Sequence, residues 1–374
     1  MDAAQESAVL SSRRGSVLGT GTILKSDHFP GAQNKKLRPI IDGAPNFRQV
    51  EGLPVYGVAI PTIDGIMNVL KECGGTVYWH NMREEPVLYI NGKPFVLREM
   101  EHPFANVEYT GITSTRVEDM EQRLKKDVLR EVGKYNGIMV CGESEEGDLI
   151  NSWEAVEPGD VQTPREVYED FKTFGFDVHY FRIPVTDERS PKEVDFDTLT
   201  HYVINATEGA ALVFNCQMGR GRTTTAMIVA SLLQVRKRAS GARPGPGRGT
   251  EAASDGQGVP SWAAETFVLP GDQGASTTLS PSSLRDCQSP LDLDLVERLK
   301  TGDYLVIRSL LRVLERGPVS KSQIDAVIDA CSGKKEVKHP ALPSNLALFP
   351  DNQCLTFPFV SPLLLLRITQ SSKT

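Results

Sequence analysis

Residues 213–223 read VFNCQMGRGRT and contain a cysteine and an arginine separated by five residues, with two glycines between them. An apolar run at 211–214 leads into this turn and predicts a short buried strand, and residues 223–234 predict an apolar helix after it. A strand, a tight turn and a helix N-terminus in that order bring backbone N–H groups and the positive end of the helix dipole to one point. The stretch therefore predicts a loop that binds a phosphoryl group.

The residue types in this loop suit a nucleophilic reaction on phosphorus. Gly219 and Gly221 let the backbone turn tightly. Cys216, surrounded by N–H donors, is expected to ionise to a thiolate that attacks phosphorus and forms a phosphocysteine. The planar guanidinium of Arg222 fits two equatorial phosphate oxygens, and Thr223 is expected to hydrogen-bond the sulfur. The expected substrate-binding positions of the loop are Gln217, Met218, Gly219, Arg220 and Gly221. The alternative is a buried cysteine in an ordinary strand-to-helix turn.

A proton donor for the leaving oxygen is predicted upstream of the loop. Residues 181–191, FRIPVTDERSP, leave a predicted strand and contain two prolines around Asp187. By itself, an aspartate in such a loop is usually a capping residue or a solvated charge. Together with the phosphate loop, Asp187 becomes the candidate general acid.

The composition of the chain limits its classes of function. The chain has 374 residues, 40% of them hydrophobic, and a formal net charge of −7, so we expect a sizeable core and no binding to nucleic acid. The six cysteines lie far apart without a CxxC pair, and no metal-ligand spacing occurs, which predicts a reducing compartment, no metal and no cofactor. We find no secretory signal, and the apolar stretch 357–368 is too short to span a membrane. These features predict a cytosolic protein without stable membrane insertion.

Four separated motifs together resemble one known family. They are GAPNFRQV at 43–50, REEPVLYINGKPFVLRE at 83–99, RIPVTDERSP at 182–191 and NCQMGRGRTTTAM at 215–227. In this order they resemble the paladin-like and protein-tyrosine-phosphatase-like inositol phosphatases, the family that includes the bacterial cysteine phytases. The resemblance covers about residues 19–235 and resumes near residue 302.

The resemblance implies a fold, a chemistry and a substrate class. The implied fold is α/β, a three-layer cysteine-phosphatase fold with a central sheet flanked by helices. Cys216 would be the nucleophile, Arg222 the phosphate clamp and Asp187 the general acid, acting on a phosphorylated small molecule or a phosphoinositide headgroup. Arg48 and Arg83 are expected at the rim of the pocket, near secondary phosphates, with surface salt bridges as the alternative.

Five segments are expected along the chain. They are a flexible lead, 1–18; a cysteine-phosphatase-like domain, 19–236; a disordered Gly/Pro/Ser-rich insertion, 237–295; a helical hairpin that completes the domain, 296–333; and an irregular tail, 334–374.

One departure from the family pattern leaves two hypotheses for function. Active members usually have histidine before the nucleophile, whereas this chain has Asn215. The first hypothesis is a cysteine-dependent phosphatase that hydrolyses phosphomonoesters of inositol phosphates or phosphoinositides. The alternative is a catalytically weak or inactive scaffold that binds phosphate, which Asn215 favours and Asp187 opposes. A redox-sensing cysteine is a third interpretation, but no resolving cysteine stands near Cys216 in the sequence.

Overall fold

The structure is a computed structural model. It describes residues 3–27, 39–144, 146, 148–187, 189, 191–241, 324–328 and 330–331. In this part the chain forms a five-stranded sheet, a six-stranded sheet and a small two-stranded hairpin. The helices are α1 (Ala3–Ser12), α2 (Ile63–Cys73), α3 (Ser114–Tyr135), α4 (Pro164–Thr173), α5 (Glu193–Asn205) and α6 (Gly221–Gly241), with a 3-10 turn, η2, at Pro158–Asp160.

The five-stranded sheet contains the phosphate loop predicted from the sequence. Its order is β12 (Val178–Val185), β6 (Val77–Arg83), β13 (Ala211–Asn215), β5 (Val55–Val58) and β4 (Arg48–Gln49). The first four strands run parallel and β4 is antiparallel to β5. The carboxyl ends of the parallel strands therefore meet at one edge, where α/β sheets commonly bind their ligands.

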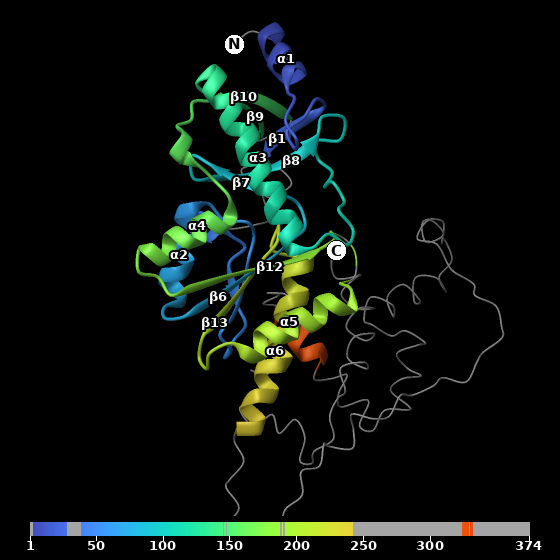
Figure 1. Cartoon of the computed structure of the whole chain (residues 1–374). Coiled ribbons are helices and arrows are strands. Elements are labelled where there is room, and N and C mark those ends of the chain that lie inside the picture. The colour runs from blue at the N-terminus through green and yellow to red at the C-terminus, as the bar shows by residue number, and fades with distance from the viewer. Residues whose placement is uncertain are drawn as a thin grey trace, which may run out of the picture.

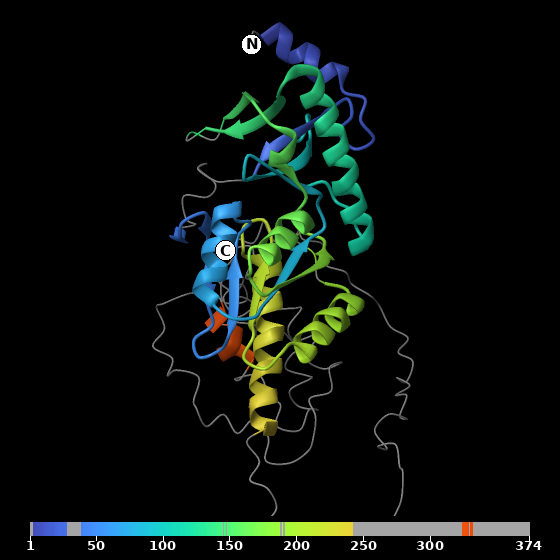
Figure 2. The ribbon, with the colours of Figure 1, turned by 60° about the vertical axis from the view of Figure 1, so that its left-hand side comes forward.

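Helices cover both faces of this sheet. Successive residues of β13 point to opposite faces, so Val213 packs in the cluster that contains Ile66 of α2 and Phe171 of α4. Phe214 packs in the other cluster, with Leu199 of α5 and residues of α6. Figures 1 and 2 show α2 and α4 on one side of the strands and α5 and α6 on the other. The predicted three-layer α/β fold with a central sheet between helices is confirmed.

The six-stranded sheet was not predicted from the sequence. Its order is β10 (Leu149–Glu154), β9 (Ile138–Glu143), β1 (Thr22–Ser26), β8 (Lys93–Glu99), β7 (Val87–Ile90) and β11 (Val161–Gln162). Helix α3 packs on it through residues such as Leu124 and Val128, which join Leu24 and Ile138 in one core cluster. Figure 1 shows this sheet, α3 and α1 at the end of the molecule opposite to the free end of α6.

Several helices form where the sequence has local signals. Helix α2 buries Ile66, Val69 and Leu70 at helical spacing, and the amphipathic α3 buries Leu124 and Val128. The Thr163-Pro164 signal marks the N-terminus of α4, where Thr163 accepts a hydrogen bond from the N–H of Glu166 and forms a capping box with it.

The segments expected at the two ends of the chain are described to different extents. Where a flexible lead was expected, the structure has α1, and Arg13 after it donates to both carboxylate oxygens of Glu131, at 2.9 and 3.0 Å. Residues 237–241 belong to α6, and the helical residues 324–328 and 330–331 bring Ile324, Val327 and Cys331 into the α5–α6 cluster. The rest of the predicted insertion, the first helix of the hairpin and the tail lie outside the described residues.

Within the part of the chain that the structure describes, no helix is both long and apolar enough to cross a membrane.

Candidate active site

Cys216 lies at the carboxyl end of the central strand. It follows Asn215, the last residue of β13, has a relative exposure of 4%, and is joined by a short loop to Gly221, where α6 begins. Gly219 has φ +67°, and a Cβ at this position would lie 2.5 Å from the backbone nitrogen of Ala59. Only glycine fits both the left-handed conformation and this close approach, so the tight turn predicted from the sequence depends on Gly219.

The carbonyl groups of the loop are directed away from its centre. The carbonyl oxygen of Gln217 accepts from the N–H of Ile60 at 3.0 Å. Asn46 Nδ2 donates to the carbonyl oxygens of Met218 and Gly219 at 3.0 and 3.1 Å. The described residues offer no acceptor to the backbone N–H groups of positions 217–220. These N–H groups and the N-terminus of α6 form a site suited to an anion.

Arg222 is held on one edge and open on the other. Its Nη1 donates to both carboxylate oxygens of Glu85, at 3.0 and 3.2 Å, and to the carbonyl oxygen of Val185 at 3.1 Å. Its Nε and Nη2 are buried and make no hydrogen bond within the described residues, although Nε forms an ion pair with Asp187 Oδ1 at 3.3 Å. The guanidinium therefore keeps one edge available for two oxygens of an anion.

Glu85 is a site residue that sequence reasoning missed. Burial would raise the pKa of Glu85, but the charges of Arg222, Arg83 and Arg98 outweigh burial and lower the pKa to about 2. Glu85 is 1% exposed and is ionised at neutral pH. It belongs to the REE motif, and its position just after a strand is the signal that could have found it.

Arg83 was expected at the rim of a pocket, but its side chain is completely buried. It is 0% exposed, its Nε donates to Glu85 Oε2 at 3.0 Å, and its Nη1 donates to Asp27 Oδ2. Arg83 ends β6 of the five-stranded sheet, and Asp27 follows β1 of the six-stranded sheet. The side chain thus points into the interface between the sheets, where buried carboxylates compensate its charge.

Arg48 is bound on all three nitrogens by the protein itself. Nε donates to the carbonyl oxygen of Cys331 at 3.1 Å, Nη1 to that of Asn46 at 3.2 Å, and Nη2 to Thr224 Oγ1 at 2.8 Å. Burial lowers the pKa of Arg48. Arg48 therefore joins β4, α6 and Cys331, and its contact with a secondary phosphate stays a prediction. Arg220, by contrast, is exposed on the loop.

Two other predicted positions lie next to the loop. Thr223 Oγ1 is buried and has no hydrogen-bond partner among the described residues, so its expected bond to the Cys216 sulfur is not formed here. Asn215 Oδ1 accepts from the indole N–H of Trp79 at 2.9 Å. The residue in the place of the usual histidine is thus fixed by a neighbouring strand of the sheet.

Asp187 lies beside the phosphate loop, and its contacts bring in residues that no motif indicated. Asp187 Oδ2 accepts from Asn106 Nδ2 at 2.6 Å, and the same nitrogen donates to Gln217 Oε1 at 3.0 Å. Gln217 Nε2 donates to Asp27 Oδ1 at 3.1 Å. Asn106 and Asp27 carry no sequence signal of this role, because each lies in a connection outside the recognisable chemistry.

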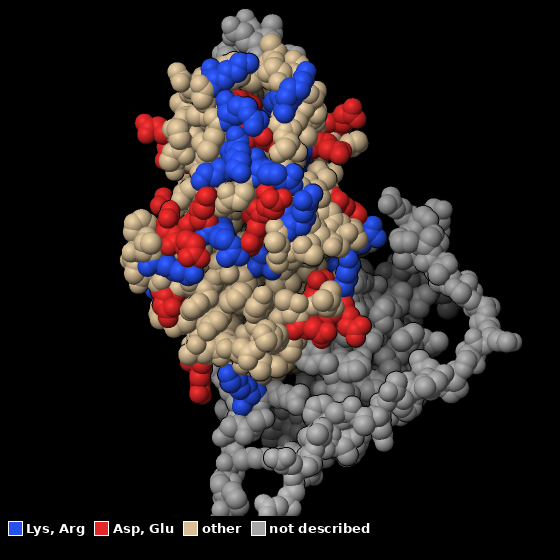
Figure 3. Space-filling view, in the orientation of Figure 1, with Lys and Arg blue, Asp and Glu red and all other residues tan. Residues whose placement is uncertain are grey.

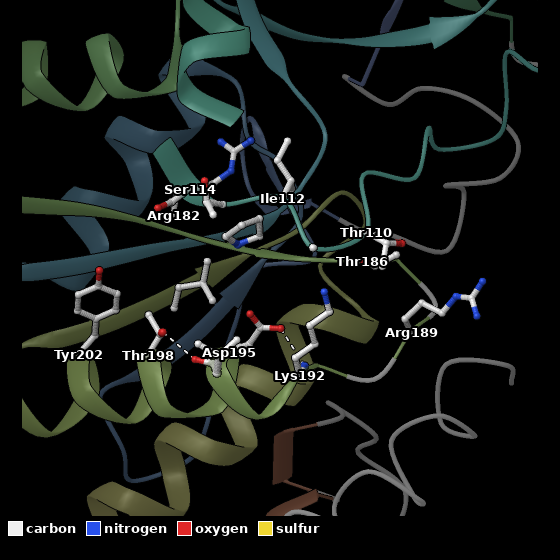
Figure 4. A pocket seen from close by; sticks show the side chains of 15 residues that line it. Thr110, Ile112, Ser114, Arg182, Thr186, Arg189, Lys192, Asp195, Thr198 and Tyr202 are labelled. Atoms are coloured by element: carbon white, nitrogen blue, oxygen red, sulfur yellow. Dashed lines mark hydrogen bonds between the residues drawn. The ribbon is translucent and has the colours of Figure 1, made fainter. Parts of the chain in front are cut away.

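A pocket of about 610 Å³ adjoins the segment that carries Asp187. It is lined by residues 110–114, the end of β12 and one face of α5, with Thr186, Lys192 and Tyr202 among the side chains in Figure 4. Its lining includes Thr186, the neighbour of Asp187, but no residue of 216–222. The pocket therefore lies next to the acid segment and apart from the phosphate loop.

The basic side chains visible in Figure 3 gather where α3 runs. On this helix Arg116 and Arg123 pair with Asp119 at 3.4 and 3.1 Å, and Arg130 pairs with Asp127 at 3.1 Å. Such pairs within one helix are typical of a solvated face. In the described residues, no group of three or more His, Cys, Asp or Glu side chains is arranged to hold a metal ion.

Comparison with known proteins adds a family to this geometry. Residues 80–234 match the PTP-like phytase family, whose description reads "Inositol hexakisphosphate". This segment is similar to the PTP-like phytase family. It includes Glu85, Asn106, Asp187, Cys216 and Arg222, and the resemblance indicated by the four motifs is confirmed.

Relatives of the phytase-like segment include several proteins named Paladin. Paladin from Gallus gallus is 33% identical over 196 residues, covering 50% of this chain and 21% of that protein. Paladin from Homo sapiens is 30% identical over 196 residues, covering 50% of this chain and 20% of that protein. The chain thus spans about a fifth of the length of these curated relatives.

Two solved structures are similar at low identity. The PTP-like myo-inositol phosphatase from Mitsuokella multacida, in complex with myo-inositol-(1,3,4,5)-tetrakisphosphate, is 18% identical with a TM-score of 0.42, covering 58% of this chain and 38% of that one. A PTP-like phytase from Bdellovibrio bacteriovorus is 22% identical with a TM-score of 0.37, covering 52% and 68%.

Proposed function

We propose that this chain is a cysteine-dependent phosphatase that hydrolyses phosphomonoesters of inositol phosphates or of phosphoinositide headgroups. The observation that carries the proposal is the open edge of buried Arg222, whose Nε and Nη2 have no hydrogen-bond partner among the described residues. Buried charged donors without acceptors are costly, so this edge is suited to an anion. The loop that ends at Arg222 also has backbone N–H groups, at 217–220, without acceptors among the described residues. A phosphoryl group satisfies both sets of donors at once.

The proposed reaction uses Cys216 and Asp187 in two steps. In the first, the Cys216 thiolate attacks phosphorus, an S–P bond forms, and the ester P–O bond breaks with its electron pair going to the leaving oxygen. That oxygen takes the proton of Asp187. In the second, water attacks the phosphocysteine while the Asp187 carboxylate accepts a proton from it, and the S–P bond breaks. The thiolate and inorganic phosphate result, so no redox partner is needed.

Arg222 and the loop would lower the barrier of both steps. Negative charge spreads over the equatorial oxygens as phosphorus changes partners, and fixed donors stabilise it without reorganising. Glu85 keeps the guanidinium in place, since it binds the edge of Arg222 opposite to the phosphate.

The substrate class rests on the family description and on the cationic surroundings of the loop. The matching family is described by inositol hexakisphosphate, a compound with several phosphates on one ring. Arg220 is exposed on the loop, so it is available to a second phosphate. We include a cytosolic location in the proposal, because widely separated cysteines suit a reducing compartment.

A phosphate-binding scaffold without turnover is the second candidate. Asn215 Oδ1 accepts from Trp79 Nε1, Asn215 Nδ2 donates to the carbonyl oxygen of Cys216 at 3.5 Å, and Thr223 Oγ1 makes no hydrogen bond among the described residues, so neither side chain supports a thiolate in this conformation. This observation favours binding without chemistry.

The test measures phosphate release from inositol phosphates, phosphoinositides and a phosphotyrosine peptide. Cys216→Ser should abolish turnover, and Asp187→Asn should lower kcat about 10²- to 10⁴-fold, the usual contribution of a general acid. Cys73→Ser, at a half-buried cysteine of α2, is the matched control and should retain activity. Chelators should leave turnover unchanged, and loss of activity on chelation would count against a cysteine mechanism.

The same compounds decide between the two candidates. If the parent chain releases no phosphate but binds them, and Arg222→Ala removes that binding, the scaffold is the correct function. If neither release nor binding occurs, both candidates fail.

A further inference from the structure

Asn106 connects the segment of the proposed acid to the phosphate loop. It lies between β8 and α3, and its Nδ2 donates one hydrogen to Asp187 Oδ2 at 2.6 Å and the other to Gln217 Oε1 at 3.0 Å. These partners are 81 and 111 residues away along the chain. One amide thus uses both of its hydrogens to join the acid segment to the phosphate loop.

The connection that carries Asn106 is itself anchored near the site. The backbone N–H of Tyr109 donates to Glu84 Oε1 at 3.2 Å, and Thr186 Oγ1 donates to Glu84 Oε2 at 2.9 Å. Glu84, which is 1% exposed, therefore links the connection that carries Asn106 to the segment that carries Asp187. The backbone N–H of Met100 also donates to the carbonyl oxygen of Gly21 at 2.8 Å. Asn106 is thus presented from a fixed support.

The other end of the bridge leads into the buried charges. Gln217 Nε2 donates to Asp27 Oδ1 at 3.1 Å, and Asp27 also accepts from Arg83. Asp27 is 0% exposed. Because both the carbonyl and the amide of Gln217 are bonded, this side chain has one orientation, which in turn directs the Asn106 amide towards Asp187.

We propose that Asn106 is a positioning residue for the proton donor, an inference that rests on the proposed phosphatase function. Asn106 binds Oδ2 of Asp187. The other carboxyl oxygen, Oδ1, makes no contact with Asn106 and lies 3.3 Å from Arg222 Nε. A bound phosphate takes that N–H of Arg222, so Oδ1 becomes the oxygen that carries the proton and passes it to the leaving oxygen. Without Asn106 the carboxyl group rotates, and donation becomes inefficient.

Two substrates with different leaving groups distinguish a role in proton donation from a general loss of structure. An alkyl leaving oxygen, as in inositol hexakisphosphate, needs the proton, whereas the phenolate of p-nitrophenyl phosphate leaves without it. Asn106→Ala should therefore lower kcat about 10- to 100-fold on the inositol ester, the loss expected for one hydrogen bond to a charged group, and less than about threefold on the aryl ester. KM should change little for both compounds.

A double variant tests the same point. In an Asp187→Asn background, Asn106→Ala should change kcat by less than about twofold, because the step it serves is already lost. Asn68→Ala removes another asparagine hydrogen bond, from Nδ2 of a half-buried residue of α2 to the carbonyl oxygen of Asp42; it is the control and should keep the kinetics of the parent.

Hydrogen–deuterium exchange gives a readout that does not depend on turnover. Asn106→Ala should raise the exchange of the peptide that contains Asp187 and leave that of β5 unchanged. Equal kinetic losses on both esters, a full effect in the Asp187→Asn background, or unchanged exchange would each overturn the role of Asn106. If the parent turns over neither ester, the proposed function fails, and exchange alone then decides whether Asn106 holds the acid segment.

Discussion

Replacing Glu85 by glutamine should destabilise the protein by about 3 kcal/mol at neutral pH. Glu85 is buried between Arg222 and Arg83, and its pKa falls from an ordinary 4.5 to about 2 because these charges and that of Arg98 outweigh burial. A pKa unit is worth about 1.4 kcal/mol, which gives the figure of about 3. Removing one partner of a buried ion pair typically costs about 3–5 kcal/mol, which is consistent with the figure of about 3 kcal/mol from the pKa shift.

The pH dependence of this loss identifies its cause. A carboxyl group whose folded pKa is lowered stabilises the protein fully above its unfolded value, near 4.5, and that stability disappears as the pH falls towards 2. The difference in unfolding free energy between parent and Glu85→Gln should therefore be constant above about pH 5.5 and shrink below about pH 4.5. Urea unfolding at several pH values, followed by fluorescence and circular dichroism, measures it.

A control and a ligand complete the assay. Glu72→Gln, at an exposed glutamate of α2, should change stability by less than about 0.5 kcal/mol. Inorganic phosphate should raise the Tm of the parent more than that of Glu85→Gln, because Arg222 loses its anchor. A loss below about 1 kcal/mol at pH 7, or a loss that is the same at pH 3 and pH 7, would refute the assignment of Glu85 as the charged anchor of Arg222.

Two further predictions concern the sheet behind the loop. Burial lowers the pKa of His80, which stacks between Phe181 and Phe214, to about 4. Between these two pH values the unfolded chain binds a proton on His80 that the folded protein does not bind. The free energy of unfolding should therefore fall by up to about 3 kcal/mol as the pH drops from about 6.5 to 4. In His80→Phe, urea titrations should show a smaller fall over this pH range. Asn215→Ala leaves the indole N–H of Trp79 buried without its acceptor and should cost about 1–3 kcal/mol, measured against exposed Asn205→Ala. A parent with no acid slope, or a harmless Asn215→Ala, would contradict the respective argument.

The parts of the site that the sequence could predict are those with local causes. The order of β13, loop and α6 is written in one continuous stretch, and the need for glycine at 219 follows from the turn itself. The cap at Thr163 is equally local. The position of Asp187 could also be predicted from its motif, because the acid segment follows β12, the strand next to β6 in the same sheet.

The parts it could not predict depend on the meeting of two sheets. The six-stranded sheet pairs β1 with β8 and β9, segments far apart in sequence, and no periodicity specifies such pairing. Arg83 resembles an exposed arginine until Asp27 is placed beside it by that pairing. Asn106 has no motif at all, and only the close approach of its connection to Asp187 and Gln217 gives it a role.

One ring of bonded side chains links substrate binding to the position of the proposed acid. The ring consists of Asp187, Arg222, Glu85, Arg83, Asp27, Gln217 and Asn106. With Arg98 4.0 Å from Asp27, three guanidinium groups face three carboxylates, so the charges within this ring balance before a substrate enters. A phosphate ester brings negative charge and takes the open edge of Arg222, which removes the cationic partner of Asp187 Oδ1. Asn106 still holds Oδ2 of the same carboxyl group. Substrate binding would thus itself free Oδ1 to face the leaving oxygen while the carboxyl group stays in place.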